Sequence, residues 1–221
     1  GVLANVSGEK VGSLGRPLPG LDHMQLAAYD FEQRRLLRDA HGMCVEAEVD
    51  EPGVLLTRVD ATKLGTTFDC YVDDEETASR LRRDVRERGD TWFLTGEIMR
   101  RDEDGDYWFL DRLSDVTRTE EGPVFTRPVE DALYQLSEIR VAAVYAVPAG
   151  AGYEQTEAAV VLRKGRKLEA EALTRCAQHL LEPHARPRLV RVVDSIAMTD
   201  GSRPLKSVAR VEAPKSFGPT F

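Results

Sequence analysis

Two short motifs near the middle of the chain carry side chains suited to binding a polar ligand: Thr95-Gly96-Glu97 and Asp111-Arg112. A carboxylate can accept hydrogen bonds from two hydroxyl groups, and a glycine lets the backbone approach a ligand closely. A guanidinium offers a rigid fork of donors to oxygen atoms. Each motif alone is short and common, so either could equally be an ordinary strand end.

Arg203 and Lys206 form a second pair of candidates, in the run Met198-Thr199-Asp200-Gly201-Ser202-Arg203-Pro204-Leu205-Lys206. Both side chains are cationic and could hold an anionic group. They are not equivalent, because a guanidinium is planar and bulky whereas an ammonium is a compact charge on a flexible stem. The bland alternative for Lys206 is a solvated surface lysine.

Charge and cysteine spacing argue against several functional classes. A formal net charge of -8 argues against a general nucleic-acid binder, because nothing offsets the repulsion of phosphates across the surface. The three cysteines are far apart and form no CxxC pair, so we expect no zinc site or disulfide framework, and a reducing, cytoplasmic setting fits. No apolar run reaches the roughly 18 residues of a membrane helix. The histidines do not cluster as metal ligands would; they are His23, His41, His179 and His184.

The N-terminal half reads as short strands, and these strands must position Glu97 and Arg112. The turn 102–105 contains the pair Asp104-Gly105, and an Asp-Gly pair is typical of a hairpin turn. The spacing of leucine and valine predicts a helix over 74–88 that ends at Gly89. Several short strands separated by turns indicate a distorted β-barrel or folded sheet. Apolar runs predict these strands at 11–14, 24–29, 43–49, 54–59, 92–99 and 106–110.

After residue 112 the pattern changes to strands that alternate with helices, which is typical of a small α+β domain. The change predicts one domain over 1–111 and a second over 112–221. The tail 212–221 contains prolines and glycine and is expected to be loosely ordered. Helices are predicted at 128–137 and 168–181, and strands at 139–147, 158–163 and 189–193.

Two stretches of the chain, GDTWFLTGEIMRRDEDGDYWFLDRLSD at 89–115 and RPRLVRVV at 186–193, resemble the adenylate-forming enzymes. The resemblance is to the C-terminal half of the very-long-chain acyl-CoA synthetase and fatty-acid transport protein branch. It implies that Glu97, where the family has aspartate, binds the ribose of ATP, and that Arg112 contacts ribose and phosphate. It also implies that the chain pivots at a hinge formed by Leu113, Ser114 and Asp115.

The same resemblance puts the family's catalytic lysine at Arg203 and a second lysine at Lys206, and Lys206 is the candidate catalytic lysine if the loop shifts by three residues. In the family the catalytic lysine bridges the substrate carboxylate and the α-phosphate during adenylation. A further departure lies at 120–123, where the family has lysine, glycine, glutamate and asparagine and this chain has Glu-Glu-Gly-Pro. This loop helps form the thioester-forming site of the family, so the departures at 97, 120–123 and 203 put catalysis in question.

The resemblance implies an ATP-dependent acyl-CoA synthetase, with 1–111 as the β-rich end of its large AMP-binding domain and 112–221 as its mobile C-terminal domain. ATP, Mg²⁺, coenzyme A and a fatty or other lipophilic acid are the implied partners, with peripheral membrane association left open. No glycine-, serine- and threonine-rich phosphate loop occurs in the 221 residues, so we expect a C-terminal fragment. Two alternatives remain: a catalytically impaired relative that binds nucleotide or lipid, and an unrelated α+β interaction module.

Overall fold

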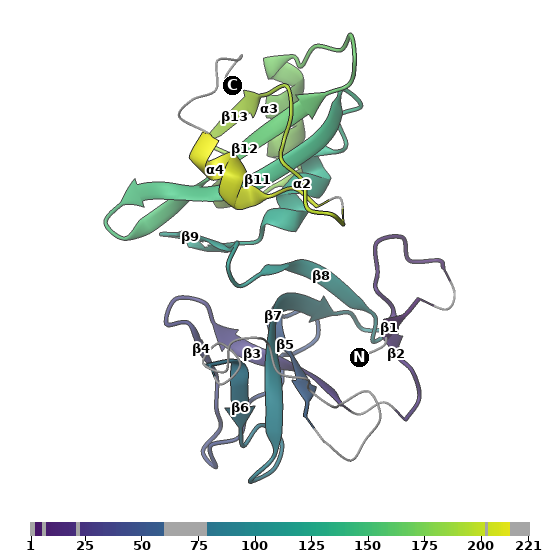
Figure 1. Cartoon of the computed structure of the whole chain (residues 1–221), viewed down its shortest axis with the longest axis vertical. Coiled ribbons are helices and arrows are strands. Elements are labelled where there is room, and N and C mark those ends of the chain that lie inside the picture. The colour runs from purple at the N-terminus through teal and green to yellow at the C-terminus, as the bar shows by residue number, and fades with distance from the viewer. Residues whose placement is uncertain (1–2, 6–7, 21–22, 60–78, 202, 213–221) are drawn as a thin grey trace. The chain divides into compact units, whose positions relative to one another are not determined.

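The chain forms two compact units in the computed structural model, Gly1–Leu113 and Ser114–Phe221 (Figure 1). Strands dominate the first unit, whereas strands and helices are mixed in the second, so the predicted α+β class is confirmed. The structure describes residues 3–5, 8–20, 23–59, 79–201 and 203–212.

A six-stranded antiparallel sheet dominates the first unit. It runs in the order β4-β3-β5-β7-β6, and β8 also pairs with β7, while β1 and β2 form a separate pair. Four of the six strands predicted in this part of the chain are present, whereas 11–14 contain a turn and no strand, and 43–49 form only isolated bridges at Cys44 and Glu46. The strands are β1 (Leu3–Ala4), β2 (Arg16–Pro17), β3 (Met24–Asp30), β4 (Arg35–Leu36), β5 (Gly53–Arg58), β6 (Leu81–Arg83), β7 (Thr91–Arg101) and β8 (Tyr107–Arg112).

The long strand β7 pairs with β6 along its first residues and with β8 along its last. Between these two stretches its register against β5 shifts, because Leu56 pairs with Leu94 while Val54 pairs with Ile98. The additional residues of β7, at 95–97, therefore form a β-bulge. Such bulges bend a strand and interrupt its ladder, which separates the pairing with β6 from the pairing with β8.

Apolar residues on both faces of this sheet are buried, because successive side chains along a strand point to opposite faces. Side chains from connecting segments contribute to each cluster, so the strand that carries Glu97 is packed from two sides. One cluster consists of Met24, Leu26, Ala47, Leu55, Met99 and Tyr107. The other consists of Ala27, Cys44, Leu56, Val85 and Trp92.

The helix predicted over 74–88 is wrong from Leu81 onward, although residues 79–80 are helical. Residues 74–78 lie outside the described residues, Leu81–Arg83 form β6, and turns and bends follow. Asp90 supplies the reason. Its carboxylate accepts the N–H of Val85 at 2.7 Å and two further backbone N–H groups, which holds this segment in a turn. Tertiary contacts thus override a helical spacing of apolar residues.

A three-stranded sheet in the order β11-β12-β13 forms the centre of the second unit. β11 and β12 are antiparallel, and β13 runs parallel to β12. The predicted strands and helices after residue 128 are all present, with shifted ends. The elements are β9 (Thr117–Thr119), β10 (Gly122–Val124), α2 (Thr126–Leu133), β11 (Ile139–Gly150), β12 (Tyr153–Leu162), α3 (Ala170–Leu180), the 3₁₀ helix η1 (Pro183–Ala185), β13 (Leu189–Val192) and α4 (Lys206–Glu212).

Helices cover both faces of this sheet (Figure 1). Apolar residues of α2 and α3 pack with Val144 and Val160 on one face. Ala209 of α4 packs with Tyr145 on the other. The sequence pattern did not predict α4, and the tail predicted to be loosely ordered lies almost wholly outside the described residues, since 213–221 are not among them.

Candidate functional site

Glu97 and Arg112 lie opposite each other on neighbouring strands of the first unit. Glu97 belongs to β7, Arg112 ends β8, and the register of the ladder pairs the two residues. Residues paired across antiparallel strands point to the same face of a sheet. Glu97 is half-buried and Arg112 is exposed. The structure therefore brings together the two residues that the sequence singled out as nucleotide ligands.

The bulge at 95–97 is fixed by a side chain and by a glycine. Thr95 Oγ1 donates to the carbonyl of Leu55 at 2.9 Å and accepts the Glu97 N–H at 3.1 Å. Gly96 has a φ of 80°, in the left-handed region that costs other residues about 1–2 kcal/mol. The carbonyl of Gly96 accepts the N–H of Leu113 at 2.8 Å. The backbone at Glu97 is thereby anchored to both neighbouring strands.

Protein contacts leave both side chains available. Within the described ranges, neither the Glu97 carboxylate nor the Arg112 guanidinium has a hydrogen bond or ion pair. A carboxylate accepts hydrogen bonds from hydroxyl groups, and a guanidinium donates to phosphate oxygens. A ligand that carries both groups, as a nucleotide does, fits this pair of side chains.

Leu113, Ser114 and Asp115 form a turn directly after β8. The boundary between the two compact units falls between Leu113 and Ser114. Leu113 is bonded to the first unit through Gly96, whereas Ser114 Oγ donates to Asp115 Oδ1 at 3.0 Å. That this turn acts as a hinge stays a prediction.

Lys206 begins α4, and its ammonium is held inside the second unit. Its Nζ lies 3.1 Å from Glu130 Oε1, with exposed side-chain fractions of 16% for the lysine and 10% for the glutamate. It also donates to Thr126 Oγ1, and the same Glu130 oxygen accepts the N–H of Val144 at 3.1 Å. Lys206 thus links α4 to α2 and β11. The alternative interpretation of Lys206 as a solvated surface lysine is wrong.

Arg203 lies on the loop that precedes α4. The N–H of Thr199 donates to the Arg203 carbonyl at 2.8 Å, and the Arg203 N–H donates to Thr199 Oγ1 at 3.1 Å. A further bond, from the Leu205 N–H to the Ala197 carbonyl at 2.8 Å, closes the loop at its base. The backbone is therefore fixed while the side chain of Arg203 is exposed and accessible to a ligand.

The segment in which the sequence departs from the family is the turn of the β9–β10 hairpin. Residues 120–121, both glutamates, form the turn and are exposed. Thr119 pairs with Gly122, whose φ is 133°. Glu154 of β12 anchors the hairpin, because it accepts the Arg118 N–H at 3.0 Å and its guanidinium at 3.2 Å. The hairpin presents two carboxylates where the family has a lysine and a glycine.

A buried ion pair in the second unit was not predicted. Arg191 donates to Glu157 Oε2 at 2.8 Å and to the hydroxyl of Tyr145, and all three side chains are buried. Burial raises the pKa of Tyr145, although the hydrogen bond from Arg191 acts in the opposite direction. The sequence did contain a signal for this ion pair, because Arg191 lies between two valines in a predicted strand. A buried charge requires a partner of opposite charge.

The second missed cluster joins the N-terminal segment to the β7–β8 turn. Asp102, Asp104 and Asp106 place carboxylate oxygens within 4.8 Å of one another. Lys10 Nζ lies 2.7, 2.6 and 3.1 Å from them, so an ammonium occupies the centre that a metal ion would need. Hydrogen bonds from Lys10 and from the indole of Trp108 hold the pKa of Asp102 well below its usual range.

Comparison with known proteins identifies the second unit. Residues 128–201 match the AMP-binding enzyme C-terminal domain. The chain is 32% identical over 200 residues to long-chain fatty acid transport protein 1 of Homo sapiens, and 35% identical over 197 residues to the medium/long-chain-fatty-acid–CoA ligase FadD6 of Mycobacterium tuberculosis. These matches take in 89% and 88% of this chain but 31% and 32% of the relatives. The chain therefore spans about a third of the length of the curated relatives it matches.

Solved structures share the fold. The amide bond synthetase McbA of Marinactinospora thermotolerans superposes with a TM-score of 0.69 at 30% identity, over 90% of this chain and 36% of McbA. The o-succinylbenzoate coenzyme A synthetase MenE of Bacillus subtilis, solved with ATP and magnesium, gives a TM-score of 0.67 at 21% identity, over 91% of this chain and 36% of MenE. The α+β architecture is thus that of the C-terminal part of adenylate-forming enzymes. Among the described helices, none has the length and apolarity needed to cross a membrane.

Proposed function

Because residues 128–201 form an AMP-binding enzyme C-terminal domain, we propose that the chain is the C-terminal part of an acyl-CoA synthetase. The intact enzyme activates a fatty or other lipophilic acid with ATP to an acyl-adenylate and pyrophosphate. It then transfers the acyl group to coenzyme A and releases AMP. Mg²⁺ accompanies the ATP phosphates, as it does for most ATP-dependent enzymes. The fatty-acid transport proteins and the fatty-acid–CoA ligase among the relatives support the choice of acid.

One observation carries the nucleotide part of this proposal. The available carboxylate of Glu97 and guanidinium of Arg112 stand opposite each other at a bulge anchored by Thr95 and Gly96. In the proposed mechanism Glu97 accepts hydrogen bonds from the ribose hydroxyls, and Arg112 donates to ribose and phosphate oxygens. Side chains carried on an anchored backbone would accelerate adenylation by orienting the α-phosphate toward the acid, because positioning lowers the entropic part of the barrier.

Arg203 is proposed to take the place of the catalytic lysine. Its exposed guanidinium, on a loop fixed by Thr199, would bridge the carboxylate of the acid and the α-phosphate. Lys206, the other candidate for this role, would first have to leave Glu130 and Thr126. Movement about Leu113, Ser114 and Asp115 would let one active site serve both half-reactions, since the mobile domain presents different residues in each.

A second function is favoured by the same residues. The ammonium of Lys206 is committed to Glu130, an arginine stands at the catalytic position, and two glutamates occupy the 120–121 turn. A relative with these features could bind nucleotide or a lipophilic acid without ligating it. The two functions differ in whether pyrophosphate is exchanged in the presence of an acid.

The deciding experiment is isotope exchange between ATP and pyrophosphate, with a panel of fatty acids, in a protein that joins this chain to an intact phosphate-binding part. We expect exchange in the wild type and an increase of about tenfold in Arg203→Lys, because a compact ammonium bridges the two anions with less displacement of neighbours. Tenfold corresponds to about 1.4 kcal/mol of barrier. The thioester step, assayed from a preformed acyl-adenylate, should change little.

Arg188→Lys is the matched control, since Arg188 is exposed and lies outside both candidate sites. Nucleotide binding without any exchange, in wild type and Arg203→Lys alike, would favour the non-ligating function. A loss of exchange in Arg203→Lys would mean that the site has adapted to arginine.

A further inference from the structure

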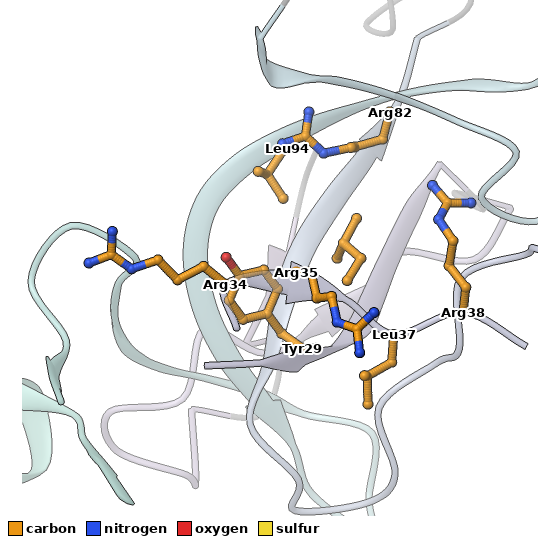
Figure 2. Close-up of a pocket in the computed structure, with 8 residues that line it drawn as sticks. Tyr29, Arg34, Arg35, Leu37, Arg38, Arg82 and Leu94 are labelled. Carbon is orange, nitrogen blue, oxygen red and sulfur yellow. The ribbon is translucent and has the colours of Figure 1, made fainter. Parts of the chain in front are cut away.

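A cavity of about 510 Å³ in the first unit is lined by four arginines, a tyrosine and three leucines (Figure 2). The arginines are Arg34 and Arg35 around the start of β4, Arg38 after it, and Arg82 on β6. No sequence motif pointed to this cavity, and it is separate from Glu97 and Arg112, neither of which lines it. Its volume falls in the usual range for small-molecule sites, about 300–1,000 Å³.

Among the described residues, these four cations have no acidic partners. Within the part of the chain that the structure describes, none of the four forms an ion pair. That is unexpected in a chain whose net charge is -8. Other cations of the same unit do pair with carboxylates, among them Arg58, Arg101 and Lys10. A concentration of unpaired guanidinium groups in one cavity attracts anions, because the cavity focuses their field.

Two of the guanidinium groups are held in place by backbone carbonyls. Arg38 donates through Nη1 to the carbonyls of Gly42 at 2.5 Å and Asp84 at 2.8 Å, and through Nη2 to the carbonyl of Arg83 at 3.1 Å. Arg82 donates through Nη1 to the carbonyls of Ser79 at 2.6 Å and Leu81 at 2.9 Å, which leaves its Nε and Nη2 without partners among the described residues. A fork of free N–H donors fixed in advance matches the geometry of a carboxylate or phosphate.

The rest of the lining is apolar. Figure 2 shows Arg82, Arg38 and Arg35 on different sides of the cavity, whereas Arg34 extends away from them. Leu94 is half-buried and packs against the core of the sheet, and Leu37 remains 38% exposed. An inorganic anion would satisfy the guanidinium groups but would leave the leucines in contact with water. Apolar surface in a pocket favours a ligand that removes it from water.

We propose that this cavity binds an anionic amphiphile, a molecule with a phosphate or carboxylate head on an alkyl chain. The head is held by Arg35, Arg38 and Arg82, and the chain lies on the leucines. This site does not depend on ligase activity. Two sources offer the same chemistry, a monomeric amphiphile in solution and an acidic phospholipid at a membrane surface.

Calorimetric titration of the chain with octyl phosphate tests the proposal, with inorganic phosphate as the comparison that lacks the alkyl tail and octanol as the comparison that lacks the anionic head. We expect octyl phosphate to bind more tightly than either compound, because only it engages both parts of the lining. Sedimentation with vesicles of phosphatidylglycerol, against vesicles of phosphatidylcholine, distinguishes the two sources. Binding to octyl phosphate alone identifies a soluble ligand, and additional binding to the acidic vesicles identifies a membrane lipid.

Arg35→Gln should weaken octyl phosphate binding about tenfold, which corresponds to about 1.4 kcal/mol. Arg35 is exposed, and its side chain makes no hydrogen bond within the described residues. The Tm of the Arg35→Gln variant should therefore match that of the wild type. Leu37→Asn should weaken octyl phosphate binding but leave any affinity for inorganic phosphate unchanged. Arg83→Gln is the matched control, because Arg83 is exposed on the same strand as Arg82 but does not line the cavity.

Three results would overturn the proposal. These are absence of octyl phosphate binding, equal weakening in Arg35→Gln and Arg83→Gln, and equal affinity for octyl phosphate and inorganic phosphate. The last result would reduce the cavity to a general anion patch. None of these measurements involves adenylation, so failure here is distinguishable from failure of the proposed function.

Discussion

Lys206 contributes its charge to packing, because its ammonium is enclosed by Glu130 and Thr126 and is 16% exposed. Lys206→Met removes the cation and leaves the Glu130 carboxylate buried without it. Removing one partner of a buried pair costs about 3–5 kcal/mol. We therefore expect the free energy of unfolding of the second unit to fall by about 3 kcal/mol in denaturant titration.

Lys164→Met provides the control for that prediction, since Lys164 is exposed in the turn before α3. It should change the unfolding free energy by less than about 0.5 kcal/mol. Unchanged stability in Lys206→Met together with a large loss of adenylation in the intact enzyme would instead assign Lys206 the catalytic role.

The pairing of Glu97 with Arg112 was predictable from the sequence, whereas the contacts of Lys206 were not. Glu97 and Arg112 flank a turn with an Asp-Gly signal, so the pairing of two short strands brings them together. Lys206 meets Glu130 and Thr126 only because α4 packs on β11 and reaches α2. Such a long-range contact depends on the whole unit, and no spacing in the sequence encodes it.

Gly53 shows how closely neighbouring elements approach in the first sheet. A Cβ added there would lie 2.8 Å from the carbonyl oxygen of Ala27 and 2.8 Å from side-chain atoms of Leu26 and Ala47. Overpacking of this kind costs about 1–3 kcal/mol. Gly53→Ala should therefore lower the stability of the first unit by about 2 kcal/mol in denaturant titration.

Gly96→Ala makes a useful comparison, because the added Cβ at Gly96 would meet no atom within 4 Å. Its cost comes from the φ of 80° alone and should be about 1–2 kcal/mol. Gly96→Asn should cost less than Gly96→Ala, since asparagine tolerates this region better. Equal costs for both substitutions would mean that the bulge relaxes away from the left-handed conformation.

The Lys10 cluster makes the stability of the β7–β8 hairpin depend on pH. Hydrogen bonds to Asp102 and Asp104 raise the pKa of Lys10 above its usual 10.5, and Lys10 lowers that of Asp102 below 3.8. A lowered carboxyl pKa stabilises the fold above 3.8 and loses that effect as the pH falls toward the folded value. A raised lysine pKa stabilises the fold below 10.5 and loses that effect at higher pH.

Lys10→Met should therefore be less stable than the wild type between about pH 4 and pH 10, with the difference in Tm shrinking outside this window. The fluorescence of Trp108, whose indole donates to Asp102 at 2.9 Å, reports the same transition. A Tm difference that stays constant from pH 3 to pH 7 would show that the cluster does not act through these charges.

Helices and strands were predicted correctly where apolar periodicity and burial agree. The prediction failed where hydrogen bonds to one side chain hold the backbone in a turn. β11 and β12 are long strands rich in buried apolar residues, and the sequence pattern predicted both as strands. The apolar residues of the segment before Asp90 have helical spacing. The Asp90 carboxylate nevertheless accepts hydrogen bonds from backbone N–H groups of that segment, and residues 81–83 pair with β7 as a strand. The hydrogen bonds from this turn to the Asp90 carboxylate are local in sequence. The strand pairing of 81–83, in contrast, requires residues of β7 further along the chain.

The separate cores of the two units bear on the behaviour of the whole molecule. In the first unit, described core residues such as Leu26 and Leu56 belong to clusters confined to residues before 113. In the second, Val144 and Tyr145 belong to clusters confined to residues after 114. Cooperative unfolding follows shared burial, so units with separate cores unfold independently unless their interface is large.

We therefore expect two unfolding transitions, which hydrogen exchange followed by mass spectrometry would assign to peptides before and after the turn at 113–115. Gly53→Ala should lower only the transition of the first unit, and Lys206→Met only that of the second, because each substitution acts within one core. In the double variant the two changes should add within about 0.5 kcal/mol, as distant sites do. A single transition that both substitutions lower would mean that the units are energetically one body, and a hinge at Ser114 and Asp115 would then have no independent domains to move.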